Sequence, residues 1–160
     1  MDQLEKNLNR IHEWIRAVDQ KVSIFLAFQG IVMTLLVSNF DDFFLNNHRL
    51  FYCSQIKILL GLAGVCILFF SCYKSIMVII SRIKGKNKHD SFIFFGGIAN
   101  MTLSEFKKVI DKASSSDYEK EYIDQIYISA KIAKRKHVIF QEAIILYAVG
   151  ILVLGVYFLI

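Results

Sequence analysis

Residues 138–160 read VIFQEAIILYAVGILVLGVYFLI, and two other runs of the chain are similarly apolar. These are residues 22–40, VSIFLAFQGIVMTLLVSNF, and residues 58–80, ILLGLAGVCILFFSCYKSIMVII. A helix that crosses a hydrocarbon core of about 30 Å needs about 20 mostly apolar residues, so each run is long enough to span a bilayer. We therefore predict an all-α integral membrane protein with three transmembrane helices at these positions.

The second run contains one charged residue, Lys74. It lies near the C-terminal end of the run, where its aliphatic stem can extend the ammonium toward the lipid headgroups. A buried helix of a soluble protein is the alternative for this run. Because 55% of the 160 residues are hydrophobic, the membrane interpretation is favoured.

Lysine and arginine are concentrated in residues 1–21 and 81–137, whereas residues 41–57 contain only Arg49 and Lys57 beside two aspartates. Cytoplasmic flanks carry the excess of these cations. We expect residues 1–21 to form a cytoplasmic amphipathic helix, residues 41–57 a short extracytoplasmic connector, and residues 81–137 a cytoplasmic segment. Four aromatic residues of the connector suit an interfacial belt: Phe43, Phe44, Phe51 and Tyr52.

Several functional classes are disfavoured. The net charge of +5 comes from cations beside membrane ends, where topology and anionic lipid explain them, so we predict no nucleic-acid partner. The three cysteines and four histidines form no metal-ligand spacing and no catalytic grouping. We expect no enzyme activity, no metal and no cofactor. The run at residues 22–40 follows a charged leader that has no small-residue cleavage site. We therefore predict a membrane anchor that is not cleaved, and not a signal peptide.

The first and third spans are predicted to extend into the cytoplasm as continuous helices. The chain contains no proline, and the leader repeats apolar residues at alternating spacings of four and three. They are Leu4, Leu8, Ile11, Ile15, Val18 and Val22. A helix that begins near Asp117 shows a similar face, made by Tyr122, Ile126, Ser129 or Ala130, and Ala133.

A small helical insert is expected between the second and third spans. Residues 85–91 are turn-prone, residues 92–95 are either a strand or a buried helix start, and Gly96-Gly97 permits a close backbone approach or a positive φ. Thr102 and Glu105 have capping-box spacing, and the following helix has one apolar face. Residues 114–116 separate it from the last long helix.

Aromatic and cationic residues of the cytoplasmic part could bind a nucleotide, because rings stack on a base and cations hold a phosphate. The aromatic residues are Trp14, Tyr118, Tyr122 and Tyr127, and the cations include Arg16, Lys131, Lys134, Arg135 and Lys136. The alternative is that these tyrosines are packing residues and the cations are topological signals. Glu142 needs a cation inside the third span, for which we expect Lys21, Arg135 or Lys136.

Three segments carry a family resemblance. They are Trp14-Ile15-Arg16-Ala17-Val18-Asp19-Gln20-Lys21, then Phe94-Phe95-Gly96-Gly97-Ile98-Ala99, and finally Gln125-Ile126-Tyr127 with Ile132-Ala133 and Lys136. In order and spacing they resemble the motifs of the transmembrane effectors of the Pycsar (pyrimidine cyclase) antiphage systems of bacteria. Gly97 departs from the pattern, which has a larger polar residue there, often histidine.

The resemblance implies that a companion pyrimidine cyclase makes cyclic CMP or cyclic UMP on infection. The effector then senses this nucleotide and impairs the bacterial inner membrane, so that infection is abortive. It implies a nucleotide site drawn from the three segments, with these members: Trp14, Arg16, Asp19, Lys21, Gly96, Gln125, Tyr127 and Lys136. Arg16 and Lys136 would face the phosphate, and Tyr127 or Trp14 the base.

Three mostly apolar helices cannot line a water-filled pore alone, so we expect a homo-oligomer, with Gly61, Gly64 and Gly150 as candidate contacts. Two other functions remain open. One is a membrane-anchored helical scaffold that binds a protein partner and no nucleotide. The other is an effector of a related defence system that answers a different cyclic oligonucleotide.

Overall fold

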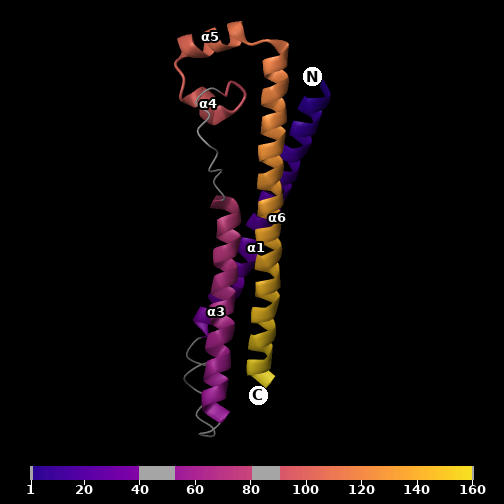
Figure 1. Ribbon diagram of the computed structural model, residues 1–160. Coiled ribbons are helices and arrows are strands. Elements are labelled where there is room, and N and C mark those ends of the chain that lie inside the picture. Colours follow the sequence, from indigo (N-terminus) through magenta and orange to yellow (C-terminus); the bar gives the residue numbers. More distant parts are fainter. Residues whose placement is uncertain (1, 40–52, 81–90, 160) are drawn as a thin grey trace. The chain divides into compact units, whose positions relative to one another are not determined.

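The computed structural model describes residues 2–39, 53–80 and 91–159, and every regular element in these ranges is a helix (Figure 1). Three helices are long: α1 (Asp2–Ser38), α3 (Cys53–Ile80) and α6 (Ser115–Leu159). Each is long and apolar enough to cross a membrane. Two are short, α4 (Phe95–Ala99) and α5 (Leu103–Lys112), and lie between the second and third long helices. The predicted all-α fold with three candidate spans is confirmed.

Both predicted long helices are continuous. At 1.5 Å per residue, α1 measures about 55 Å and α6 about 68 Å, more than the 30 Å of a hydrocarbon core. Helix α6 begins at Ser115, two residues before the predicted start. The points at which these helices enter a bilayer stay predictions, and the predicted aromatic belt of the connector lies outside the described residues.

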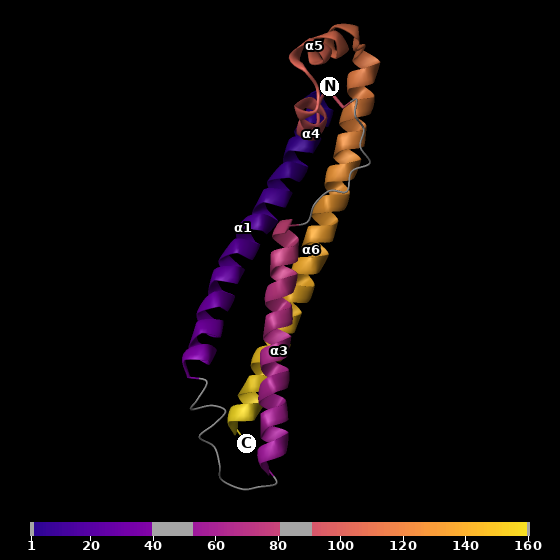
Figure 2. The same ribbon diagram turned by 90° about the vertical axis from the view of Figure 1, so that its left-hand side faces the viewer.

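The chain forms two compact units. One comprises Val18–Ser81 and Lys136–Ile160 and is called here the spanning unit; the other comprises Met1–Ala17 and Arg82–Arg135 and is called the polar unit. In the spanning unit α1, α3 and α6 lie side by side (Figure 2). Each unit contains parts of both α1 and α6, so both helices are shared by the two units.

In the spanning unit, α3 and α6 pack through a seven-residue pattern. On α3 the buried positions are Gly61, Gly64, Leu68, Ser71, Ser75 and Val78, which alternate spacings of three and four. On α6 the buried positions Lys136, Ala143, Gly150, Leu154 and Tyr157 follow the same register. A repeat of 3.5 residues keeps one face of each helix toward its neighbours, as in a left-handed coiled coil. The leader heptad predicted for α1 is confirmed, because all six of its members are buried or half-buried.

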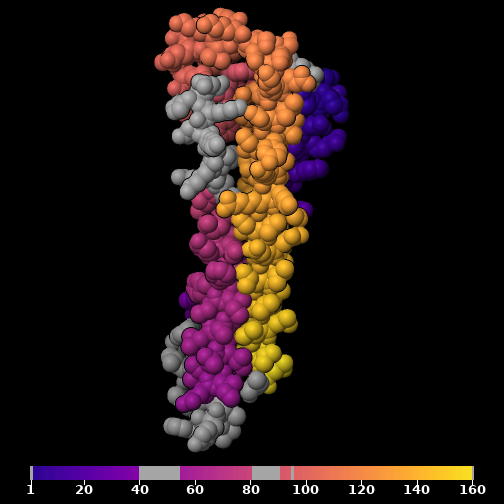
Figure 3. Space-filling model, viewed as in Figure 1, coloured from indigo at the N-terminus to yellow at the C-terminus, as the bar shows by residue number. Residues whose placement is uncertain are grey.

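Helices α3 and α6 lie against each other (Figure 3), and they approach closely at two glycines. A Cβ atom on Gly64 would lie 2.8 Å from Cγ and Cδ2 of Leu154, and one on Gly150 would lie 2.7 Å from Cδ2 of Leu68. Small residues let helix backbones pack tightly where no water-driven force holds them together. We expected these glycines at contacts between copies, and the structure places Gly64 and Gly150 at contacts within the chain.

In the polar unit, α5 begins at the predicted capping box. The Thr102 hydroxyl accepts a bond from the Glu105 amide at 3.3 Å, and the Glu105 carboxylate accepts one from the Thr102 amide at 2.8 Å. Helix α6 begins at a similar reciprocal cap that we had not predicted. The Ser114 amide donates to the Asp117 carboxylate at 3.0 Å, and the Asp117 amide donates back to the Ser114 hydroxyl at 3.3 Å. Its Ser-x-x-Asp spacing is a recognised signal, so the sequence contained it.

Candidate functional site

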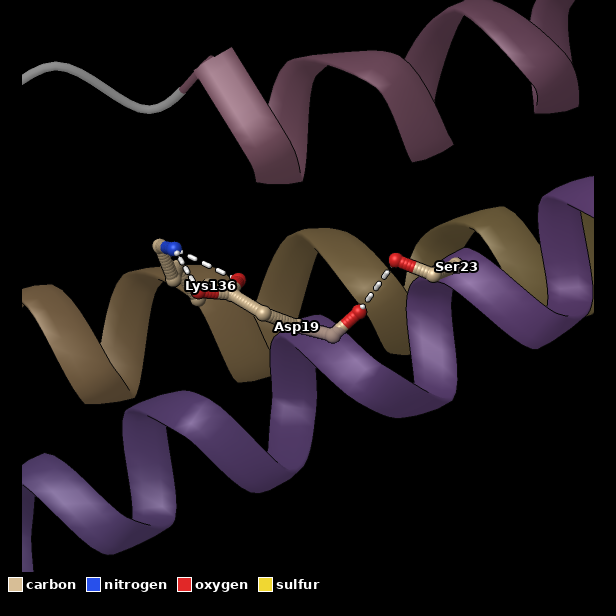
Figure 4. Close-up of polar contacts among 3 residues, drawn as sticks. All are labelled: Asp19, Ser23 and Lys136. Carbon is tan, nitrogen blue, oxygen red and sulfur yellow. Dashed lines mark hydrogen bonds and ion pairs between the residues drawn. The ribbon is translucent and has the colours of Figure 1, made fainter.

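The first and third signature segments meet in an ion pair between α1 and α6. The Lys136 ammonium lies 2.6 and 2.8 Å from the two carboxylate oxygens of Asp19 (Figure 4). The Lys136 side chain is 8% exposed and that of Asp19 is 39% exposed. The pair joins residues 117 positions apart in the chain, and it lies where the two helices enter the spanning unit. One hydroxyl supports it indirectly, since Ser23 donates to the backbone carbonyl of Asp19 at 2.9 Å.

Two other cations of the predicted site are exposed. Arg16 lies on the outer surface of α1 in the polar unit, and Lys21 lies on the outer surface of α1 in the spanning unit. Both have charged ends that solvent or a ligand can reach. Lys136, in contrast, is already neutralised by Asp19, so an anion that binds it has to compete with that carboxylate.

The aromatic residues of the polar unit divide into packed and exposed groups. Tyr118 packs edge-on against Phe92, with ring centroids 4.8 Å apart, and Tyr122 is half-buried. Trp14 and Tyr127 are each 60% exposed. The Lys131 ammonium lies 4.2 Å from the Tyr127 ring centroid, a cation–π geometry. The packing alternative therefore holds for Tyr118, whereas Trp14 and Tyr127 keep ring surface available for stacking.

The second signature segment is held by a buried polar contact. The Ser91 hydroxyl bonds to the Glu121 carboxylate, both residues being buried, and it accepts a bond from the Phe94 amide at 3.0 Å. Gly97 is buried directly against the Ser91 backbone, and a Cβ atom there would overlap the Ser91 carbonyl oxygen. A side chain at this position of α4 would therefore require the Ser91 backbone to shift. Phe92–Phe94 forms no strand, and the helix starts at Phe95.

The remaining two members of the predicted site are half-buried. Gly96 lies beside the Phe94 ring, which a Cβ atom would meet at 2.6 Å. Gln125 is half-buried on α6. Of the eight predicted residues, the structure thus brings Asp19 and Lys136 into direct contact, and that all eight form one nucleotide site stays a prediction.

The cation that pairs with Glu142 was predicted wrongly. Its carboxylate lies 2.8 Å from the Lys74 ammonium of α3, and not beside Lys21, Arg135 or Lys136. Lys136 is engaged by Asp19, and the rotation of α3 places Lys74 opposite Glu142. Within the described ranges, no three His, Cys, Asp or Glu side chains gather as a metal site would require.

The fold and these contacts define a helical protein with three candidate membrane spans, in which a partly buried ion pair joins α1 to α6. The family model of PycTM, the Pycsar effector protein domain, matches residues 3–160. The chain therefore belongs to the PycTM family of antiphage membrane effectors. The Pycsar effector protein GmPycTM of Gulbenkiania mobilis is 26% identical in an alignment of 160 positions that covers 87% of this chain and 81% of that protein. No solved structure is significantly similar to the chain.

Proposed function

We propose that this protein is an antiphage effector that binds cyclic CMP or cyclic UMP and, in response, impairs the bacterial inner membrane so that infection is abortive. The nucleotide would come from a companion pyrimidine cyclase. The support is the family, which covers nearly the whole chain, and the name of the relative, a Pycsar effector protein. The effector needs no catalytic step of its own in this account, because the bound nucleotide acts only by changing how the helices pack.

The observation that favours a sensing role is the ion pair between Asp19 and Lys136. Both residues belong to segments that resemble the family signature, and the pair fixes α1 against α6 at the start of the spanning unit. The cyclic phosphate of a nucleotide carries one negative charge and can replace Asp19 as the partner of Lys136. Such an exchange would weaken the contact between α1 and α6. The ligand can shift the packing only by as much as its affinities for the paired and the separated arrangement differ.

Exposed groups in the signature segments supply the other parts of a nucleotide site. Arg16 and Lys21 are additional cations for the phosphate, and Trp14 and Tyr127 offer ring faces for the pyrimidine. Gly96 and Gln125 complete the proposed set. In this proposal the site faces the cytoplasm, with the N-terminus on the same side, because the flanking cations are concentrated there.

We propose that the active form is a homo-oligomer. The described parts of α1, α3 and α6 pack on one another mainly through small and apolar side chains, and three such helices cannot line a water-filled path alone. Large apolar side chains cover the outer faces of all three helices, including Ile31, Leu59 and Leu152. Lipid or neighbouring copies would cover these surfaces.

Calorimetric titration of the purified protein with cyclic CMP and cyclic UMP tests the proposal. We expect heat with one or both nucleotides and its loss in the Arg16→Ala variant, with Lys120→Ala as a control because Lys120 is exposed and lies outside the signature segments. Absence of heat with either nucleotide would contradict the proposal. A copurifying protein would then favour the scaffold, and heat with a cyclic oligonucleotide would favour a related defence system.

A further inference from the structure

The interior of the spanning unit contains a layer of polar side chains from all three helices. The Gln29 side-chain amide donates to the Ser71 hydroxyl at 2.7 Å, and that hydroxyl donates to the Ala143 carbonyl at 2.7 Å. Gln29, Ser71 and Ser75 are fully buried. We call Gln29, Ser71, Ser75 and Tyr147 the polar layer. Gln29 lies seven residues beyond Val22, about 10 Å into the predicted span.

This polar layer is incompletely hydrogen-bonded. Three of its buried atoms find no partner among the described residues: Gln29 Oε1, Ser75 Oγ and the Tyr147 hydroxyl oxygen. The Tyr147 ring packs edge-on against Phe25 and Phe28, at centroid distances of 5.2 and 5.9 Å. Unpaired polar atoms are unfavourable inside a bilayer, where no solvent can satisfy them. Polar side chains that join membrane helices are usually hydrogen-bonded across the helices, and these three atoms are not.

All three unpaired atoms are neutral oxygens, one from an amide and two from hydroxyls. Such oxygens hydrogen-bond to water and replace part of the hydration shell of a monovalent cation. An ion pair, Lys74 with Glu142, adjoins the layer in sequence on α3 and α6 and brings further polar atoms to the same region of the span. Its two side chains are 29% and 48% exposed, so this pair is only partly enclosed by the helices.

We propose that the polar layer is a binding site for water and monovalent cations, and that in the assembled, nucleotide-bound form it faces the narrowest part of the path through which ions cross. This inference rests on the proposed impairment of the membrane by a nucleotide-bound form. In the resting packing the layer is closed by the surrounding apolar side chains. A shift of α1 against α6 would let water reach the unpaired oxygens and so favour the hydrated state.

Potassium release from vesicles that contain the purified protein tests this inference, with cyclic CMP and cyclic UMP added in turn. The variants Ser75→Ala and Tyr147→Phe each remove an unpaired hydroxyl, so the resting fold loses no bond. We expect about tenfold slower release per molecule, the effect of one lost hydrogen bond to the moving ion or its water. The matched controls are Thr34→Val and Tyr73→Phe, which remove exposed hydroxyls outside the layer and should leave release unchanged.

Ion preference provides a second readout, which a purely structural role would not move. Gln29→Glu places a carboxylate in the layer, and we expect the preference for potassium over chloride to rise. Two results together would overturn the inference and leave the proposed function intact. The first is that Ser75→Ala and Tyr147→Phe release potassium as fast as the wild-type protein. The second is that Gln29→Glu has the same ion preference as the wild-type protein. No release from wild-type vesicles with either nucleotide would overturn both the inference and the proposed function.

Discussion

Among the charged residues of the predicted site, Lys136 has the least exposed side chain. Its ammonium is almost fully enclosed, and the structure supplies one counterion, Asp19, through both carboxylate oxygens. An enclosed cation without a partner is strongly unfavourable, whereas the partly exposed carboxylate can still reach water. The two partners of this ion pair are therefore not equivalent.

This asymmetry predicts unequal effects on stability. Asp19→Asn leaves the buried ammonium without a counterion and should lower the free energy of unfolding by about 1–3 kcal/mol. Lys136→Met removes the buried charge and keeps the side-chain volume, so its effect should be smaller. Thermal unfolding in one detergent measures both, with Lys21→Met as the exposed control. A larger loss for Lys136→Met than for Asp19→Asn would contradict this interpretation.

The sequence predicted only part of the side-chain pairing. The sequence indicated that Glu142 needs a cation, because a carboxylate inside a span is unfavourable alone. It could not identify Lys74, since that choice depends on how α3 is rotated about its own axis relative to α6. The buried bond between Ser91 and Glu121 was missed for the same reason, as neither side chain is unusual in its local sequence.

At the scale of elements, the long helices follow directly from the apolar runs, the heptad spacing and the lack of proline. The sequence left open whether Ser129 or Ala130 lies on the inner face of α6, and the structure shows Ser129 buried and Ala130 exposed. The close approach of α3 to α6 was not predictable. Glycine in an apolar run is compatible with contacts inside the chain or between copies, and the structure assigns Gly64 and Gly150 to the first kind.

Two glycines of α6 provide a matched test of this packing. A Cβ atom at Gly150 would meet the buried Leu68, whereas nothing lies within 4 Å of one at Gly155. We expect Gly150→Val to lower the free energy of unfolding by about 1–3 kcal/mol through overpacking. Gly155→Val should change it by less than about 0.5 kcal/mol. Equal effects in thermal unfolding of the two variants would mean that α6 does not pack on α3 through Gly150.

The helix caps of the polar unit predict a response to acid. The Thr102 amide and hydroxyl hold the pKa of Glu105 below its ordinary 4.5, and the Ser114 hydroxyl and amide hold that of Asp117 below its ordinary 3.8. A lowered pKa means that each carboxylate stabilises its cap above the ordinary value, and that this contribution disappears as the pH falls through the lowered value. The starts of α5 and α6 should therefore fray in acid.

Amide signals of residues 103–112 and 115–117 in a nuclear magnetic resonance titration measure this fraying. In Glu105→Gln the response of α5 to acid should be lost, while that of the α6 cap remains. An unchanged response of α5 in this variant would show that another group controls it.

In the protein as a whole, nucleotide sensing and membrane impairment are both proposed for the same long helices. Helices α1 and α6 carry signature residues at one part of their length and candidate membrane spans at another. A ligand that alters the contact between Asp19 and Lys136 would act on helices that continue into the spanning unit. No change of secondary structure is then needed for a signal to affect the bilayer, because a small shift in packing suffices.

The most direct test measures the membrane potential of vesicles that contain the purified protein, with cyclic CMP or cyclic UMP present on both sides. We predict that at least one nucleotide collapses the potential with the wild-type protein. Arg16→Ala, inserted to the same level, should keep the potential intact. A potential that neither nucleotide changes in wild-type vesicles, or that collapses equally in Arg16→Ala, would contradict the account of a nucleotide-triggered membrane effector.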